Sequence, residues 1–310
     1  MTPCVLARRP HKRALKNSLS DAPSLKNLSS HSRLRQNRNR AARTQTVNGR
    51  TVLLVVKYGG HAIAAGAGDP VLDECAARFA DGDRIVIVHG GAPQIDAAAR
   101  RQALVERRIA GLRVTDPATL EVVEAVLCGT VNKALVRALL ARGARAAGLC
   151  GQDGALLRAR RIAGPLGEDL GAVGEIEHVD ASILNALLAG GFLPVVAPLA
   201  LDGASGEPLN VNADTSAGAI AAALAADAYV VVTAVPRVLR ARDDPRSGID
   251  RLERGAAERG LANGAFDGGM GPKIRSALQA LEGGVGRAVI CGTSQAPIAG
   301  ALRGEGTEVF

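Results

Sequence analysis

From residue 51 onward, short runs of apolar and often β-branched residues alternate with longer Ala- and Leu-rich segments whose apolar positions recur at helical spacing. This alternation is typical of a mostly parallel sheet covered by helices, so the sequence predicts an α/β fold. We expect strands at Val52–Lys57, Arg84–Val88, Ala144–Leu149, Leu193–Ala197, Tyr229–Thr233 and Arg287–Cys291. We expect helices at Val71–Ala80, Pro93–Leu104, Pro117–Ala141, Ala181–Ala189, Asp214–Ala226 and Pro272–Glu282.

Between Gly154 and Glu177 the apolar periodicity becomes short and hairpin-like. We expect a small β insert here that covers one end of the sheet. In open sheets of this kind, ligands bind beyond the carboxyl ends of the strands. The residues that directly follow the predicted strands are therefore the best candidates for chemistry.

The positive charge of the chain, formally +8, is concentrated at its start. Residues 1–50 hold twelve Lys or Arg and one acid, Asp21, so the remainder of the chain is mildly acidic. A polar, basic segment with little apolar periodicity cannot offset the entropy lost on ordering. We expect residues 1–46 to be a disordered basic extension and residues 47–310 to form one folded domain. An organellar transit peptide and a tether to nucleic acid or membrane stay open as alternatives for the extension.

The composition argues against several classes of protein. Aromatic residues make up 2% of the chain and Trp is absent, which disfavours a nucleic-acid-binding module built on base stacking. Five cysteines are scattered without a CxxC pair, as expected in a reducing compartment and without a structural zinc site. The Ala-rich run from Ala217 to Ala226 is too short to span a membrane. We expect a cytoplasmic protein, or an organellar one if the extension is a transit peptide.

Two of the predicted strands run directly into glycine pairs. The first ends in Lys57-Tyr58-Gly59-Gly60-His61 and the second in His89-Gly90-Gly91-Ala92-Pro93-Gln94. Glycine lets the backbone approach an anion and present N–H groups to it, and the start of a following helix adds a favourable dipole. Because the chain has 37 glycines, each pair taken alone is better explained as an ordinary turn.

Three charged residues strengthen the case for an anion site. Lys57 ends an otherwise apolar strand, where a charge is costly unless an anion meets it. Lys273 lies in a third glycine-rich turn, which enters a helix. Asp214 stands at the start of an Ala-rich helix, where it would also serve as the N-cap. Taken singly, either lysine also fits a surface position with its charge in water.

Five segments, in this order and spacing, resemble the N-acetylglutamate kinase branch of the amino acid kinase family. They are Lys57-Tyr58-Gly59-Gly60, His89-Gly90-Gly91, Gly111-Leu112-Arg113-Val114-Thr115, Asn210-Val211-Asn212-Ala213-Asp214 and Gly268-Gly269-Met270-Gly271-Pro272-Lys273. The resemblance implies a three-layer αβα sandwich around a mainly parallel sheet, with the amino acid bound by the N-terminal half of the domain and the nucleotide by the C-terminal half. It also implies ATP-dependent phosphorylation of the side-chain carboxylate of N-acetylglutamate, the second step of arginine biosynthesis.

The resemblance assigns catalytic roles to three residues. Lys57 and Lys273 would stabilise the transferring phosphoryl group, and Asp214 would hold both ammonium groups in place. The product would be an acyl phosphate, formed by direct in-line attack without a phosphoenzyme. Magnesium would arrive with ATP, held mostly by phosphates and water, so we expect no dedicated metal site.

The resemblance also assigns binding roles. Arg113 would bind the substrate α-carboxylate, while Asn210 and the backbone at Gly91 and Ala92 would bind the rest of the acylated amino acid. The short C-terminal end and the polar leader imply a homodimer without arginine feedback, and we expect no nucleic acid or membrane partner. The residues implied to bind the nucleotide are Gly59, Gly60, Ala234, Leu239 and Gly269.

The chain departs from the family pattern in two places. Ala234 and Arg237 stand where the family usually has Asp and Gly in the segment that lines the nucleotide site, which leaves a catalytically impaired regulatory homologue as an alternative. Ala92 replaces a common third glycine, which leaves the acceptor open. The segment Cys128-Gly129-Thr130-Val131-Asn132-Lys133 also resembles kinases that act on 2-aminoadipate or glutamate attached to a small acidic carrier protein. Such a carrier, or simply water, would meet the basic hairpin residues Arg158, Arg160 and Arg161.

Overall fold

The computed structural model describes residues 51–63, 68–266 and 268–310. The described residues belong to one compact unit, Thr46–Phe310, and everything below concerns it. The extension predicted at residues 1–46 lies outside the described residues. Within the described part of the chain, no helix is both long and apolar enough to cross a membrane.

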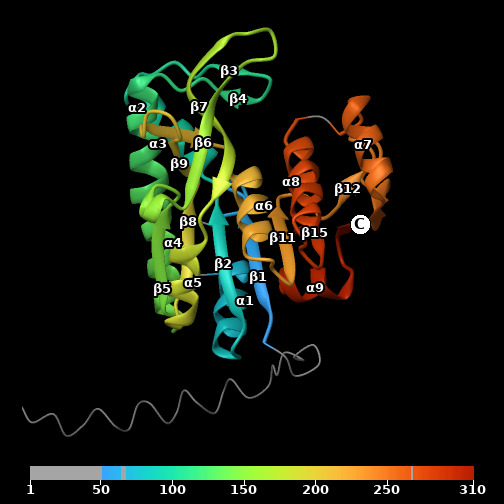
Figure 1. The fold of residues 1–310 in the computed structure, drawn as a ribbon. Coiled ribbons are helices and arrows are strands. Elements are labelled where there is room, and N and C mark those ends of the chain that lie inside the picture. The colour runs from blue at the N-terminus through green and yellow to red at the C-terminus, as the bar shows by residue number, and fades with distance from the viewer. Residues whose placement is uncertain (1–50, 64–67, 267) are drawn as a thin grey trace, which may run out of the picture. The chain divides into compact units, whose positions relative to one another are not determined.

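An eight-stranded sheet forms the centre of this unit (Figure 1). Every neighbouring pair of strands is parallel except β15 with β16. All six predicted strands are present, with ends shifted by no more than two residues. The order across the sheet is β14 (Arg251–Leu252), β16 (Thr307–Val309), β15 (Ala288–Gly292), β11 (Ala228–Thr233), β1 (Leu53–Tyr58), β2 (Arg84–His89), β8 (Leu193–Ala197) and β5 (Ala146–Cys150).

The sheet separates two apolar cores, because successive side chains of a strand point to opposite faces. Val55 belongs to one core, together with residues of α5 to α8, while its neighbours Leu54 and Val56 belong to the other, together with residues of α1 to α4 and α9. These two helical layers and the sheet form the predicted three-layer sandwich. The helices are α1 (Pro70–Ala80), α2 (Ala92–Arg101), α3 (Pro117–Glu124), α4 (Asn132–Ala141), α5 (Ser182–Ala189), α6 (Ala213–Ala223), α7 (Arg254–Ala262), α8 (Met270–Glu282) and α9 (Pro297–Arg303).

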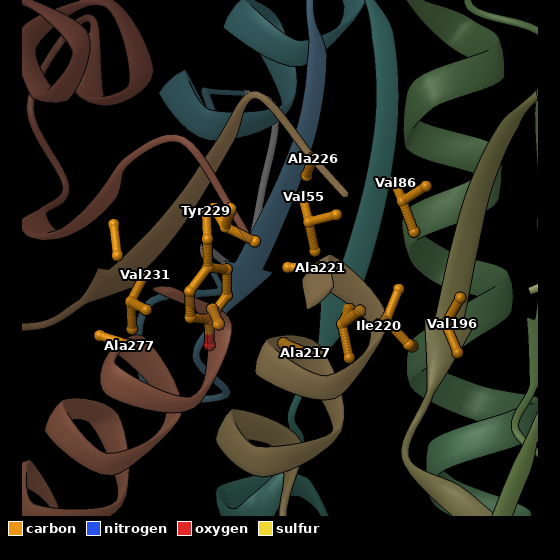
Figure 2. Packing of buried hydrophobic residues seen from close by; sticks show 14 of the residues in the cluster. Val55, Val86, Val196, Ala217, Ile220, Ala221, Ala226, Tyr229, Val231 and Ala277 are labelled. Atoms are coloured by element: carbon orange, nitrogen blue, oxygen red, sulfur yellow. The ribbon is translucent and has the colours of Figure 1, made fainter. Parts of the chain in front are cut away.

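Small residues allow α6 to lie close to both the sheet and α8. Figure 2 shows Ala217, Ile220 and Ala221 of α6 facing Val55 and other valines of the sheet. Where α6 meets α8, a Cβ added to Gly218 would lie 2.6 Å from the backbone oxygen of Ser276, which is closer than real Cβ contacts. A residue without a Cβ is thus required at Gly218, where α6 meets α8.

The long helix predicted at Pro117–Ala141 is not one regular helix. A π-helical segment, η2 (Ala125–Val131), separates α3 from α4. Its wider turns place Leu127 and Val131 against Gly91, where an added Cβ would lie 2.8 Å and 3.4 Å from their side chains. A π-helical turn is rare and has no apolar signature of its own, so periodicity could not reveal it.

The predicted β insert is present, but it is larger than the sequence indicated. The hairpin of β6 (Leu157–Ala163) and β7 (Asp169–Val179) closes into a four-stranded barrel with β9 (Leu199–Asp202) and β10 (Pro208–Val211). Figure 1 shows a second, short hairpin beside it, formed by β3 (Arg108–Ile109) and β4 (Leu112–Arg113).

Candidate active site

Two lysines and an aspartate from distant parts of the chain form an ion cluster. The Nζ atom of Lys57 lies 2.8 Å from Oδ1 of Asp214, and Nζ of Lys273 lies 3.3 Å from its Oδ2. The exposed fractions of the three side chains are 6% for Lys57, 8% for Asp214 and 12% for Lys273. The structure therefore brings together the three residues that the sequence predicted as catalytic.

Each member of the cluster stands at the end or start of an element. Lys57 lies near the carboxyl end of β1, Asp214 in the first turn of α6 and Lys273 in the first turn of α8. Asp214 is not the N-cap of its helix. Asn212 is, and its Oδ1 accepts hydrogen bonds from the backbone N–H groups of Asp214 at 2.7 Å and Thr215 at 3.3 Å. Because Asn212 caps α6, the Asp214 carboxylate faces the two lysines instead.

The charges of the cluster explain its ionisation. Burial raises the pKa of Asp214, but the charges of Lys57 and Lys273 outweigh that effect and hold the pKa below its usual range. Burial and the charge of Lys57 lower the pKa of Lys273, while Asp214 opposes both. One carboxylate between two ammonium groups leaves one positive charge without a counter-ion. That charge is costly to bury unless an anion approaches, so the cluster favours anion binding.

A buried tyrosine ties the cluster to the core. The hydroxyl of Tyr229, on β11, donates a hydrogen bond to the backbone oxygen of Asp214 at 3.1 Å. It also lies 3.1 Å from Oγ of Ser276, which donates to the backbone oxygen of Lys273 at 2.8 Å. Burial raises the pKa of Tyr229 well above its usual value, so the hydroxyl keeps its proton. Figure 2 shows that hydroxyl between the helices that carry Ala217 and Ala277. These contacts fix the first turns of α6 and α8 relative to each other.

A cavity of about 240 Å³ opens beside the cluster. It lies beyond the carboxyl ends of β1 and β2 and is closed on one side by the β3–β4 hairpin and β10. The cavity thus has cationic groups at two places in its wall, the lysine cluster and the pair Arg108 and Arg113. Its wall includes every predicted catalytic and substrate-binding residue, Lys57, Asp214, Lys273, Gly91, Ala92, Arg113 and Asn210, together with Gly59 and Gly60.

A second cavity, of about 600 Å³, adjoins the first. Three of the predicted nucleotide-binding residues, Ala234, Leu239 and Gly269, line it, whereas Gly59 and Gly60 line the first cavity. Both cavities share His61, Thr233 and Lys273 in their walls. The ion cluster therefore stands where two ligands would meet.

The backbone loops beside the cluster touch each other. A Cβ added to Gly60 would lie 2.8 Å from the backbone nitrogen of Gly91, and one added to Gly90 would lie 3.1 Å from the backbone nitrogen of Gly60, so glycine allows the two loops to come this close. His89, which is fully buried, supports the loop after β2. Its Nδ1 donates to the carbonyl oxygen of Gly90 at 3.0 Å, and its Nε2 accepts from the amide of Asn132 at 3.2 Å. Burial lowers the pKa of His89 to about 4, so the ring is neutral and acts as a support.

The predicted substrate arginine has partners on the protein. Arg113 is buried, and its Nη2 donates a hydrogen bond to Oδ1 of Asp96, a residue of α2. The same Nη2 lies 3.7 Å from Oε1 of Glu106. Asn210, also predicted to bind substrate, donates from its Nδ2 to the hydroxyl of Thr115 at 3.1 Å.

Two residues at the site, His61 and Asp96, were not predicted from the sequence. His61 lines both cavities, yet it stood in a segment noted only for its lysine and glycines. Asp96 gives no signal in the sequence, because a carboxylate on an amphipathic helix is ordinarily a solvated residue.

Among the described residues, no group of three or more His, Cys, Asp or Glu side chains is placed to hold a metal ion.

Comparison with known proteins places the chain in a family. The sequence model of the amino acid kinase family matches residues 52–292, more than half of the chain. The chain therefore belongs to the amino acid kinase family. Among its relatives, the acetylglutamate kinase of Symbiobacterium thermophilum is 43% identical over 246 residues, which cover 77% of this chain and 83% of that protein. The acetylglutamate kinase of Nitrobacter hamburgensis is 44% identical over 254 residues, covering 76% and 82%.

Solved structures agree with the fold of the family. A protein of Streptococcus mutans UA159 superposes with a TM-score of 0.71 at 27% identity, covering 83% of this chain and 98% of that chain. N-acetylglutamate synthase from Neisseria gonorrhoeae, complexed with coenzyme A and N-acetyl-glutamate, gives a TM-score of 0.70 at 26% identity, covering 84% and 60%. Carbamate kinase from Giardia lamblia, at 16% identity and a TM-score of 0.58, supports the fold alone. The predicted fold class is thereby confirmed.

Proposed function

We propose that this protein is an acetylglutamate kinase, which transfers the γ-phosphoryl group of ATP to the side-chain carboxylate of N-acetylglutamate in arginine biosynthesis. The observation that carries the proposal is the Lys57–Asp214–Lys273 cluster at the junction of two cavities. The relatives named acetylglutamate kinase, at 43% and 44% identity, support this acceptor.

Phosphoryl transfer between two anions needs positioning and fixed positive charge more than covalent chemistry. In the proposed reaction a side-chain carboxylate oxygen attacks the γ-phosphorus in line, the bond to the β–γ bridging oxygen breaks, and ADP leaves. Lys57 and Lys273 stabilise the charge that gathers on the transferring group, and Asp214 keeps both ammonium groups in position. The positive charge left over in the cluster is then matched by phosphate.

The two cavities divide the ligands between them. The first would hold the acylated amino acid, with Arg113 on its α-carboxylate and Asn210 and the Gly91–Ala92 backbone on the rest. The second would hold the nucleotide, beside Ala234, Leu239 and Gly269. This division is supported by the residues that line the second cavity. Apart from His61, they all belong to the C-terminal segment between Thr233 and Lys273. The N–H group of Gly60, at the shared end of the first cavity, would meet the terminal phosphates, whereas that of Gly59 already donates to the backbone oxygen of Val232 at 3.1 Å.

The nucleotide would bring its metal with it. Magnesium supplies charge neutralisation on the phosphates when it is bound, and the hard-oxygen ligands it prefers would come mainly from ATP and water. The carboxylate of Asp214 is engaged by two lysines, which suits a role in orienting cations of the protein. We further propose a homodimer that works in the cytoplasm.

The test is ATP-dependent formation of an acyl phosphate, trapped with hydroxylamine as the hydroxamate. Purified protein receives N-acetylglutamate, N-acetylaminoadipate and glutamate in parallel, with Lys273→Ala as the inactive control. We expect turnover with N-acetylglutamate that exceeds the other two. Turnover of another acceptor would redirect the assignment. Silence with all three would refute the proposal and favour a kinase for a carrier-bound substrate or a regulatory homologue.

A further inference from the structure

Four charged side chains gather at the end of the first cavity that is formed by the β3–β4 hairpin. Asp96, on α2, accepts a hydrogen bond from Arg113 and lies 3.4 Å from Nη2 of Arg108. Glu106 lies 2.6 Å from Nε of Arg108 and 3.7 Å from Arg113. Both arginines line the cavity, whereas neither acid does. Asp96 therefore contacts both arginines without lining the cavity itself.

Asp96 and Glu106 differ in the arginine that each contacts most closely. The Asp96 side chain is 20% exposed and is the direct hydrogen-bond partner of the buried Arg113. Glu106 is 35% exposed, and its close contact is with Arg108, which is itself 38% exposed. A guanidinium has five N–H donors in a rigid plane, and only the Nη2 atom of Arg113 is engaged by these acids. The remaining donors of Arg113 are available to a carboxylate in the cavity.

Helix α2 connects this arginine to the other end of the cavity. The helix begins at Ala92, directly after the Gly91 loop, and Asp96 follows one turn later. The backbone at Gly91 and Ala92 and the guanidinium held by Asp96 are thus fixed to the same rigid segment. The first turn of α2 therefore sets the distance between the two parts of the protein that a bound molecule would contact, the Gly91–Ala92 backbone and the Arg113 guanidinium.

We propose that Asp96 is a positioning residue, which holds the Arg113 guanidinium so that its remaining donors select a carboxylate at the far end of the acceptor. The inference rests on the proposed function, since it takes Arg113 to be the group that meets the α-carboxylate. Asp96 acts through Arg113 and does not touch the substrate. Without it, the carboxylate left near the Arg113 guanidinium among the described residues is that of Glu106, at 3.7 Å.

The experiment compares Asp96→Ala, Asp96→Asn and Glu106→Gln with the unmodified protein. Each is assayed with N-acetylglutamate and with its analogue that carries a carboxamide in place of the α-carboxylate. Asp96→Ala should raise the KM for N-acetylglutamate by about tenfold to a hundredfold, the loss expected for a hydrogen bond to a charged group. The KM for ATP should stay unchanged, and the preference for the α-carboxylate over the carboxamide should shrink by a similar factor.

The two other variants separate positioning from charge and from general damage to the hairpin. The amide oxygen of Asp96→Asn still accepts a hydrogen bond, so it should recover most of the lost affinity, and Glu106→Gln should change the KM by less than about threefold. An unaltered preference in Asp96→Ala, or equal effects of Asp96→Ala and Glu106→Gln, would overturn the proposal. If thermal denaturation shows that Asp96→Ala does not fold, Asp96→Glu takes its place: its longer side chain displaces the carboxylate, so it should raise the KM for N-acetylglutamate and weaken the α-carboxylate preference more than Asp96→Asn does. An inactive unmodified protein would instead refute the proposed function, and calorimetric binding of N-acetylglutamate to the same variants would then decide the role of Asp96.

Discussion

Replacing Asp214 with Asn removes a negative charge from between two buried ammonium groups and changes the side-chain volume very little. The two lysine nitrogens lie 2.8 Å and 3.3 Å from the carboxylate, and all three side chains are at most 12% exposed. Removing one partner of a buried ion pair typically costs about 3–5 kcal/mol, because the charge left behind has lost its compensation. Here the amide oxygen still accepts one hydrogen bond and the cavity admits water, so we expect the free energy of unfolding of Asp214→Asn to fall by about 3 kcal/mol.

The pH dependence of this loss follows from the two shifted groups. The folded-state pKa of Asp214 is lowered, so its stabilising contribution is present above the unfolded pKa, about 3.9, and is lost as the pH falls through the folded pKa. The pKa of Lys273 is lowered by burial and by Lys57, and only Asp214 opposes that fall. In the variant Lys273 therefore releases its proton at lower pH. Since the unfolded chain then binds more protons than the folded one, stability rises with pH.

The assay is urea denaturation of both proteins at about pH 7 and about pH 9, with Asp73→Asn as the control. Asp73 pairs with Arg142 at 2.6 Å, but its side chain is 57% exposed, so its loss should change stability by less than about 1 kcal/mol. We expect the Asp214→Asn deficit to shrink as the pH rises. A deficit no larger than that of the control, or one that grows with pH, would refute the account of the cluster.

Three further substitutions test other parts of the account. Lys273→Ala should lower turnover by about a hundredfold or more while the thermal unfolding midpoint shows an intact fold, as expected for loss of a transition-state charge donor; near-normal turnover would remove Lys273 from the catalytic set. Arg113→Ala should raise the KM of the amino acid in steady-state kinetics and leave that of ATP unchanged, and the reverse pattern would contradict its role. Gly218→Ala should lower the free energy of unfolding by about 1–3 kcal/mol, because its Cβ would lie 2.6 Å from the oxygen of Ser276; unchanged denaturation would show that α6 and α8 have room to move apart.

The sequence predicted the central sheet well because buried parallel strands are continuous apolar runs. The strand at Leu193–Ala197 was predicted with the bounds that the structure has. Strands of two or three residues, such as Thr307–Val309, carry too few positions to show a period. Two features were missed because they depend on distant contacts. They are the π-helical segment at Ala125–Val131 and the pairing of Pro208–Val211 with the insert hairpin.

The convergence of Lys57, Asp214 and Lys273 was implied by the resemblance to the family. It agrees with the fold, because each residue stands at a strand end or helix start at one edge of the sheet. The sequence suggested Asp214 as the N-cap of α6, and this was wrong: Asn212, two residues earlier, holds that position. The contact of Asp96 with Arg113 depends on how α2 is rotated against the β3–β4 hairpin. No local pattern in the sequence records that rotation.

The most direct test of the central claim is a crystal structure with N-acetylglutamate and a non-hydrolysable ATP analogue bound together. The account predicts the nucleotide in the cavity beside Leu239, its γ-phosphate within hydrogen-bond distance of Lys57 and Lys273, and the side-chain carboxylate of the acceptor in line with it. A nucleotide bound elsewhere, or an acceptor whose side-chain carboxylate points to Arg113, would contradict it.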